Sequence, residues 1–141
     1  MKVFLDTNVV IDFYSQRREF YRPAAIIFDL AYRKKINICV SAITFVNAFF
    51  ILRKAYSKDE LYTSMKSLAA LCEITKADSL MIHRSLERQT NDFEDCVQYE
   101  SAMAHSADVV VTRNIKDFTG LDCSVMTPAE FLDTHSSLLA Q

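Results

Sequence analysis

Glycine and proline are scarce in this chain, whose 141 residues include one glycine and two prolines. Flexible linkers and low-complexity tracts are rich in such residues, and the sequence contains no tract of that kind and no internal repeat. Hydrophobic residues make up 50% of the chain and charged residues 24%, which is typical of a folded protein and not of a disordered one. We therefore expect a single domain over residues 1–141, with short and stiff connections.

Long apolar runs are also absent. No run reaches the roughly 18 to 20 residues that a membrane-spanning helix needs. Asp6 interrupts the N-terminal segment before it reaches the length of a secretory signal core. We therefore expect a cytoplasmic protein that does not contact a membrane.

The four cysteines are Cys39, Cys72, Cys96 and Cys123, and no two of them form a CxxC pair. That spacing argues against a zinc site, and each cysteine lies in an apolar segment. We expect buried free thiols, as is usual in a reducing compartment.

The chain has no excess of basic charge, since 16 Lys and Arg residues face 18 Asp and Glu residues, for a net charge of −2. Proteins that coat nucleic acid by bulk electrostatics are usually basic. The charge balance therefore argues against a passive coat of this kind.

Short apolar segments alternate with helical ones along the chain. We expect strands at 2–6, 36–40, 72–75, 108–112 and 124–126, separated by helices. Two helices carry capping boxes, in which Ser57 pairs with Glu60 and Thr127 with Glu130. Strands that are apolar on both faces and separated by helices indicate a parallel sheet covered on both sides. The predicted fold class is α/β: a doubly wound, three-layer α/β/α domain with a short-stranded, mostly parallel central sheet.

An asparagine interrupts the most apolar of these helices, in the segment SAITFVNAFFILRK at 41–54. Ser41 is a suitable N-cap, and a helix that is apolar on nearly every side is expected to be buried. An unpaired buried amide costs roughly 1–3 kcal/mol, so Asn47 needs a partner. Either Asn47 bonds a neighbouring backbone group in the core, or the helix delivers this side chain to a functional site.

Several acids are expected at one edge of the sheet, because ligands in such folds bind beyond the carboxyl ends of the strands. Asp6 follows the first strand directly, and Asp117 follows the strand at 108–112. Asp92 and Asp95 are three residues apart and share one side of a helix. Each acid also has a structural alternative: a helix cap, a favourable helix dipole, or, in the case of Asp117, an ion pair with Arg113 or Lys116.

Carboxylates that converge in this way repel one another, and some would be driven to protonate. Mg²⁺ or Mn²⁺ removes the conflict, because hard divalent cations prefer carboxylate oxygens. Such an ion can activate water for attack on a phosphodiester. Thr112 and Asn114 lie beside Asp117 as hydrogen-bonding groups, whereas we expect Asp12 to be a helix-surface acid and Asp108 to be structural.

Three segments of the chain resemble the PIN domain family, and most closely its VapC-type toxin ribonuclease branch. The segments are LDTNVVIDFY, SAITFVNAFFILRK and DFEDCVQYESAMAHSADVVVTRNIKDF, and the likeness extends over roughly residues 1–130. The resemblance implies a metal-dependent ribonuclease with acids at four positions. Three of these match Asp6, Asp95 and Asp117, which are then the catalytic and metal-binding residues. Asn8 and Thr112 match supporting positions, and Asp92 assists. The fourth position, usually a glutamate, falls on Asn47.

The leading hypothesis is an endoribonuclease that uses Mg²⁺ or Mn²⁺ to hydrolyse RNA and is the toxin of a toxin–antitoxin pair. The resemblance adds a small antitoxin as partner and a homodimer. The alternative is a weakened or inactive PIN domain that binds RNA or protein, because Asn47 is neutral and cannot act as a base. A phosphotransferase of the haloacid dehalogenase type would require an aspartate two residues after Asp6, where the chain has Asn8.

Overall fold

A five-stranded parallel sheet forms the centre of the computed structural model, which describes residues 1–118 and 122–140. The strand order is β3-β2-β1-β4-β5, and all four pairings are parallel. The strands are β1 (Lys2–Leu5), β2 (Asn37–Ser41), β3 (Glu73–Thr75), β4 (Val109–Val111) and β5 (Val125–Met126). The predicted short-stranded, mostly parallel sheet is thus confirmed, and among the described strands it is parallel throughout.

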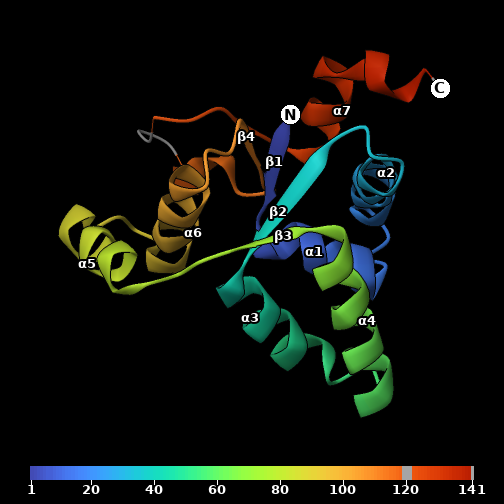
Figure 1. The fold of residues 1–141 in the computed structure, drawn as a ribbon, viewed down its shortest axis with the longest axis horizontal. Coiled ribbons are helices and arrows are strands. Elements are labelled where there is room, and N and C mark those ends of the chain that lie inside the picture. The colour runs from blue at the N-terminus through green and yellow to red at the C-terminus, as the bar shows by residue number, and fades with distance from the viewer. Residues whose placement is uncertain (119–121, 141) are drawn as a thin grey trace.

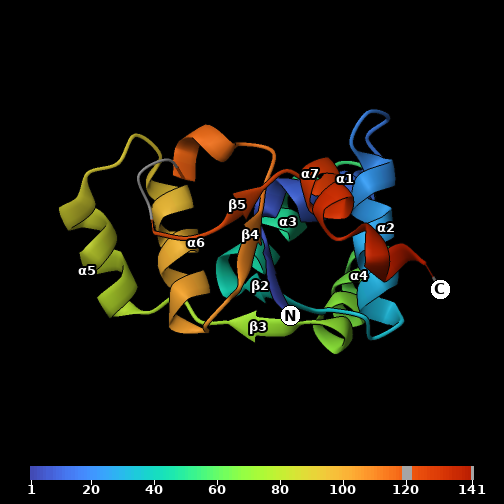
Figure 2. The same cartoon turned by 90° about the horizontal axis from the view of Figure 1, so that it is seen from above.

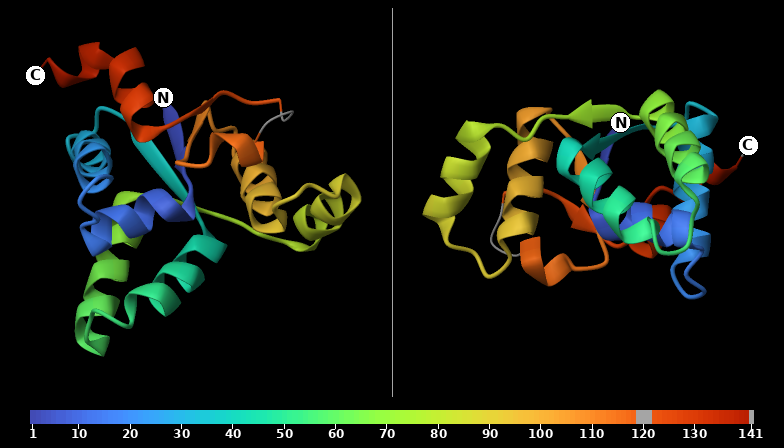
Figure 3. Two further views of the ribbon diagram at one scale, coloured as in Figure 1. Left: turned by 180° about the vertical axis from the view of Figure 1, so that it is seen from behind. Right: turned by 90° about the horizontal axis from the view of Figure 1, so that it is seen from below.

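Helices cover both faces of the sheet (Figure 1). They are α1 (Thr7–Ser15), α2 (Tyr21–Tyr32), α3 (Ala42–Leu52), α4 (Lys58–Leu71), α5 (Ser79–Arg88), α6 (Phe93–Ala104) and α7 (Pro128–Thr134), with 3₁₀ helices η1 (Ile115–Phe118) and η2 (Ser136–Leu139). Figure 2 shows α5 and α6 on one side, and α1, α2, α4 and α7 on the other. The views from behind and below agree (Figure 3), so the three-layer prediction is confirmed. In the described ranges, no helix combines the length and apolar character needed to cross a membrane.

The strands are apolar throughout because both faces of the sheet are buried. Successive side chains point to opposite faces, so Val3 and Leu5 join the larger core cluster, beneath α1, α2 and α4. Phe4, Cys39 and Val110 join a second cluster on the α6 side. Apolar side chains on both faces therefore fix the register of β1, β2 and β4 between two helical layers.

Helix starts are set by side-chain caps, most of which the sequence predicts. The Ser41 hydroxyl accepts the Thr44 N–H at the start of α3. The capping boxes at Ser57 and Thr127 are both complete. At the start of α6 the cap is Asp92. These local bonds determine the residue at which each of these helices begins.

The predicted burial of α3 on every side is wrong. Thr44, Ala48 and Leu52 are its buried residues, whereas Val46 is 70% exposed and Phe50 57%. The helix packs against α1 and α4, so only the side facing those helices is covered. The outer side of α3 therefore presents apolar side chains to solvent.

The prediction of four buried free thiols holds only in part. All four cysteines are free, but Cys39 and Cys96 alone are buried. Cys72 is partly exposed because it stands at the end of α4, where the chain turns toward β3. Burial raises the pKa of the Cys39 thiol to about 12, so this side chain behaves as a small apolar core residue.

The capping box of α4 provides a stability test. Ser57→Ala removes the acceptor for the Glu60 N–H and should lower the free energy of unfolding by ~1 kcal/mol. Ser67→Ala is the matched control, because Ser67 is exposed in the middle of the same helix and alanine favours helix there. Urea denaturation measures both variants. Equal losses would contradict a specific contribution from the cap.

Candidate metal centre

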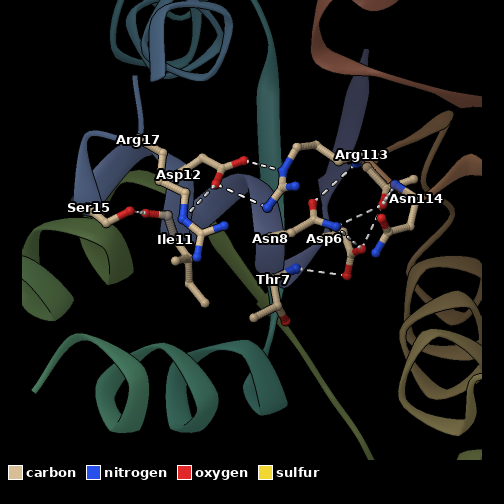
Figure 4. Close-up of polar contacts among 10 residues, drawn as sticks. Asp6, Thr7, Asn8, Ile11, Asp12, Ser15, Arg17, Arg113 and Asn114 are labelled. Carbon is tan, nitrogen blue, oxygen red and sulfur yellow. Dashed lines mark hydrogen bonds and ion pairs between the residues drawn. The ribbon is translucent and has the colours of Figure 1, made fainter. Parts of the chain in front are cut away.

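Asp6 lies at the carboxyl end of β1 and is 1% exposed. Its Oδ1 accepts the Thr7 N–H at 2.8 Å, so it also caps α1. Its Oδ2 accepts a hydrogen bond from the Thr112 hydroxyl at 2.7 Å and another from the Asn8 amide at 3.2 Å (Figure 4). Asp6 is therefore both the N-cap of α1 and a residue of the site, and Asn8 and Thr112 fix the orientation of its carboxylate.

Asp92, Asp95 and Asp117 come together from two further elements. Asp92 caps α6 by accepting the Asp95 N–H at 2.9 Å, which places Asp95 in the first turn of that helix. Asp117 lies in η1, beyond the end of β4. One carboxylate oxygen from each of these three residues lies within 4.8 Å of the others.

The predicted triad of Asp6, Asp95 and Asp117 is divided between two overlapping groups. Asp117 belongs to the group with Asp92 and Asp95. Asp6 belongs to a second group, in which single oxygens of Asp6, Glu94 and Asp95 also lie within 4.8 Å of one another. Asp95 is common to both groups and therefore stands at the centre of the site.

Burial and mutual repulsion raise the pKa values of two acids in this site, Asp6 and Asp95. Burial raises the pKa of Asp6, although hydrogen bonds from Thr112, Thr7 and Gln98 oppose the rise. Burial, followed by the charges of Asp6, Asp92 and Asp117, raises the pKa of Asp95 to about 8. Carboxylates so placed cannot all be charged at neutral pH unless a cation joins them.

Gln98 hydrogen-bonds several polar side chains beneath the site, and the sequence did not point to it. It is fully buried on α6, and its amide donates to the hydroxyls of Thr7 at 2.9 Å and Thr44 at 2.8 Å. Its carbonyl oxygen accepts the Ser41 hydroxyl. One glutamine thus connects α6 with the starts of α1 and α3, where the polar side chains enter the site.

Asp12 is the clearest error of prediction outside the site, because it is 1% exposed and not on the surface. Arg113 binds it through two hydrogen bonds, with Nε to Oδ2 at 2.6 Å (Figure 4). The same guanidinium lies 4.2 Å from the centre of the Phe20 ring. The Arg113 side chain is thus bound to Asp12 and not to Asp117. The alternative in which Asp117 forms an ion pair with Arg113 is therefore wrong.

Asn47 and Glu94 meet at the side of the site formed by α3. The Asn47 side chain hydrogen-bonds Glu94, as does Thr7. The core alternative for Asn47 is therefore wrong, since its partner is a site carboxylate. Asn114, the remaining predicted residue, is exposed and contributes its backbone N–H to the Thr112 hydroxyl at 3.0 Å.

The donor set fits a hard divalent cation. Among the described residues, the two acidic groups offer carboxylate oxygens and no thiolate or imidazole. Oxygen ligands are those that Mg²⁺ and Mn²⁺ prefer. Asp95 is only 5% exposed, yet its Oδ2 is buried with no hydrogen-bond partner among the described residues. A buried carboxylate oxygen without a partner is costly, and a cation would satisfy it.

Comparison with known proteins gives one family and several relatives. The family model described as "PIN domain" matches residues 2–116. Ribonuclease VapC1 of Aquifex aeolicus (strain VF5) is 24% identical over 142 residues, which cover 97% of each chain.

Solved structures show the same fold. A toxin–antitoxin complex from Klebsiella pneumoniae matches with a TM-score of 0.65 and 23% identity, covering 89% of this chain and 97% of the other. VapBC-1 from nontypeable Haemophilus influenzae matches with a TM-score of 0.66 and 17% identity, covering 92% and 99%.

The raised pKa of Asp95 predicts how stability depends on pH without metal. The stability due to the neutral side chain is fully present below pH 3.8, the ordinary value, and is lost as the pH rises toward about 8. Asp95→Asn removes this loss. In EDTA at pH 8 its melting temperature should exceed that of the parent by ~3 °C or more, as expected for ~1 kcal/mol in a domain of this size.

At about pH 3, below the ordinary pKa of 3.8, the parent and Asp95→Asn should melt within ~1 °C of each other, because Asp95 is then neutral in both the folded and the unfolded parent. Asp133→Asn, an exposed substitution on α7, is the control and should be neutral at both values. Scanning calorimetry provides the measurement. A variant that is less stable than the parent at pH 8 would show that repulsion does not dominate the site.

Proposed function

Because this chain belongs to the PIN domain family, we propose that it is a Mg²⁺- or Mn²⁺-dependent endoribonuclease and the toxin of a toxin–antitoxin pair. The observation that carries the proposal is the set of carboxylates at the carboxyl edge of the sheet, in which Asp95 links Asp6 to Asp117. The similarity to a protein named ribonuclease VapC1 supports RNA as the substrate. The similarity to the toxin–antitoxin complex from Klebsiella pneumoniae supports the assignment to a toxin–antitoxin pair.

Asp6, Asp95 and Asp117 are the proposed metal-binding and catalytic residues. A divalent ion held there supplies a Lewis acid for the phosphate and activates water for the attack. The chain's own contribution is orientation. Hydrogen bonds from Thr112, Asn8 and the Thr7 backbone hold Asp6 in one position. Hydrogen bonds of this kind orient the ligands of a metal ion.

The proposed partners are a small antitoxin and a second copy of the chain. Two apolar surfaces support this proposal. One is the outer side of α3, with Val46, Phe50 and Ile51 exposed. The other is an open groove between α2 and α4, whose lining includes Tyr21 and Tyr32. Exposed apolar patches of this kind commonly mark protein interfaces.

A second candidate function rests on Asn47. With an amide in place of the fourth acid, the domain would bind RNA or protein without cleaving it. The two functions differ in one observable, because the binding module retains affinity for RNA but has no metal-dependent turnover.

The nuclease proposal predicts that purified protein cleaves RNA in Mg²⁺ or Mn²⁺ and that EDTA stops the reaction. Asp6→Asn, Asp95→Asn and Asp117→Asn should each reduce the rate by ~100-fold or more, which corresponds to the loss of ~2.7 kcal/mol of transition-state stabilisation. Initial rates on a fluorescent RNA measure the effect.

Asp108→Asn is the matched control for the cleavage assay. Asp108 is exposed and precedes β4, at the opposite end of that strand from Asp117. This variant should cleave at the parental rate. If Asp6→Asn cleaved as fast as the parent, the activity would belong to a contaminant. RNA binding without any cleavage would favour the second candidate function.

The dimer proposal predicts that charge on the outer side of α3 separates the two copies. Phe50→Asp should yield monomers in light scattering at concentrations where the parent is dimeric, because a buried unpaired carboxylate opposes association. Leu86→Asp is the control, since Leu86 is 56% exposed on α5, outside both of these surfaces, and the variant should leave the dimer intact. A parent that is monomeric at every concentration would contradict the proposal.

A further inference from the structure

Glu94 is the acid of this site that neither the motif nor the spacing singles out. It precedes Asp95 in the first turn of α6, and its side chain hydrogen-bonds Thr7 of α1 and Asn47 of α3. One of its carboxylate oxygens lies within 4.8 Å of oxygens of both Asp6 and Asp95. Glu94 therefore spans the gap between α6 and the helix that carries Asn47.

Adjacent residues on a helix do not normally face each other, because each is turned by about 100° from the last. Glu94 would therefore be expected to turn away from Asp95 and into solvent. The bonds from Thr7 and Asn47 instead direct its carboxylate toward Asp6 and Asp95. A glutamate that served only the helix dipole would need no such contacts and would avoid two like charges.

Asn47 has a definite role in this arrangement. Its amide can donate a hydrogen bond, which a glutamate at the same position could not. The donor fixes the Glu94 carboxylate, so α3 positions an acid that is carried by α6. The site thereby keeps the number of carboxylates that the change to asparagine would otherwise reduce.

We propose that Glu94 supplies the metal-binding carboxylate that is missing at Asn47, and that Asn47 is a positioning residue for it. The proposal rests on the proposed function, since it concerns the same cation. It is supported by an independent feature, the buried Asp95 Oδ2 without a hydrogen-bond partner among the described residues. One carboxylate oxygen of Asp95 also lies within 4.8 Å of single oxygens of Asp6 and Glu94.

The test measures Mn²⁺ binding to the full chain by isothermal titration calorimetry, with no RNA present. Glu94→Gln keeps the size and the hydrogen-bond acceptor of the side chain but removes its charge. It should weaken Mn²⁺ binding by about 10-fold or more, the range found when a metal site loses a supporting group. Glu87→Gln, on the exposed side of α5, is the matched control and should bind like the parent.

The double variant Glu94→Gln/Asn47→Glu distinguishes a metal ligand from a structural residue. A carboxylate returned at position 47 should restore most of the affinity lost in Glu94→Gln. Asn47→Glu alone should bring no gain of about 10-fold, because Glu94 already supplies the charge. Thermal unfolding in EDTA checks that all variants fold.

Two results would overturn the proposal. The first is that Glu94→Gln binds Mn²⁺ as tightly as the parent while Asp95→Asn loses binding. That result would remove Glu94 from the metal site but would not contradict the proposed nuclease function. The second is a lack of rescue by the double variant. If the parent bound Mn²⁺ in a Glu94-dependent way but cleaved no RNA, the nuclease function would fail and the assignment of Glu94 would stand.

Discussion

Repulsion between carboxylates at one edge of the sheet is the constraint on which the rest of this structure depends. The parallel pairing of β1 with β4 places Asp6 beside Thr112, and the chain continues from there to Asp117 in η1. Helix α6 then adds Asp92, Glu94 and Asp95. Uncompensated, this charge destabilises the fold. Apolar cores on both sides of the sheet offset the cost, and hydrogen bonds hold Asp6 in place.

The distribution of basic side chains sharpens the functional interpretation. Arg113 follows the strand that leads into the site, yet its side chain binds Asp12, one turn along α1 from Asn8. Arg84 and Arg88 bind Glu100, another buried acid on α6. Buried acids with structural roles thus have their own arginines, whereas Asp95 shares its surroundings with other acids. Perturbed acids left without such partners are typical of functional sites.

Much of the fold could be predicted because its signals are local. The capping boxes at Ser57 and Thr127 each involve residues three positions apart, and the strands are short apolar runs between helices. Glu94 and Gln98 could not be assigned in this way, because their roles depend on contacts with residues of α1 and α3 that lie 47 to 91 positions away in the sequence. The error over α3 has another origin. The sequence shows that α3 is apolar, but it does not show which side of the helix is covered by the rest of the chain.

The central claim is that the acids around Asp95 share a divalent cation, and a crystal structure obtained with Mn²⁺ tests it most directly. The account predicts an anomalous difference peak in contact with Asp95 Oδ2 and with a carboxylate oxygen of Asp6, Glu94 or Asp117. An Asp95 carboxylate bound by a lysine, an arginine or water alone at high Mn²⁺ concentration, with no peak beside it, would contradict the account.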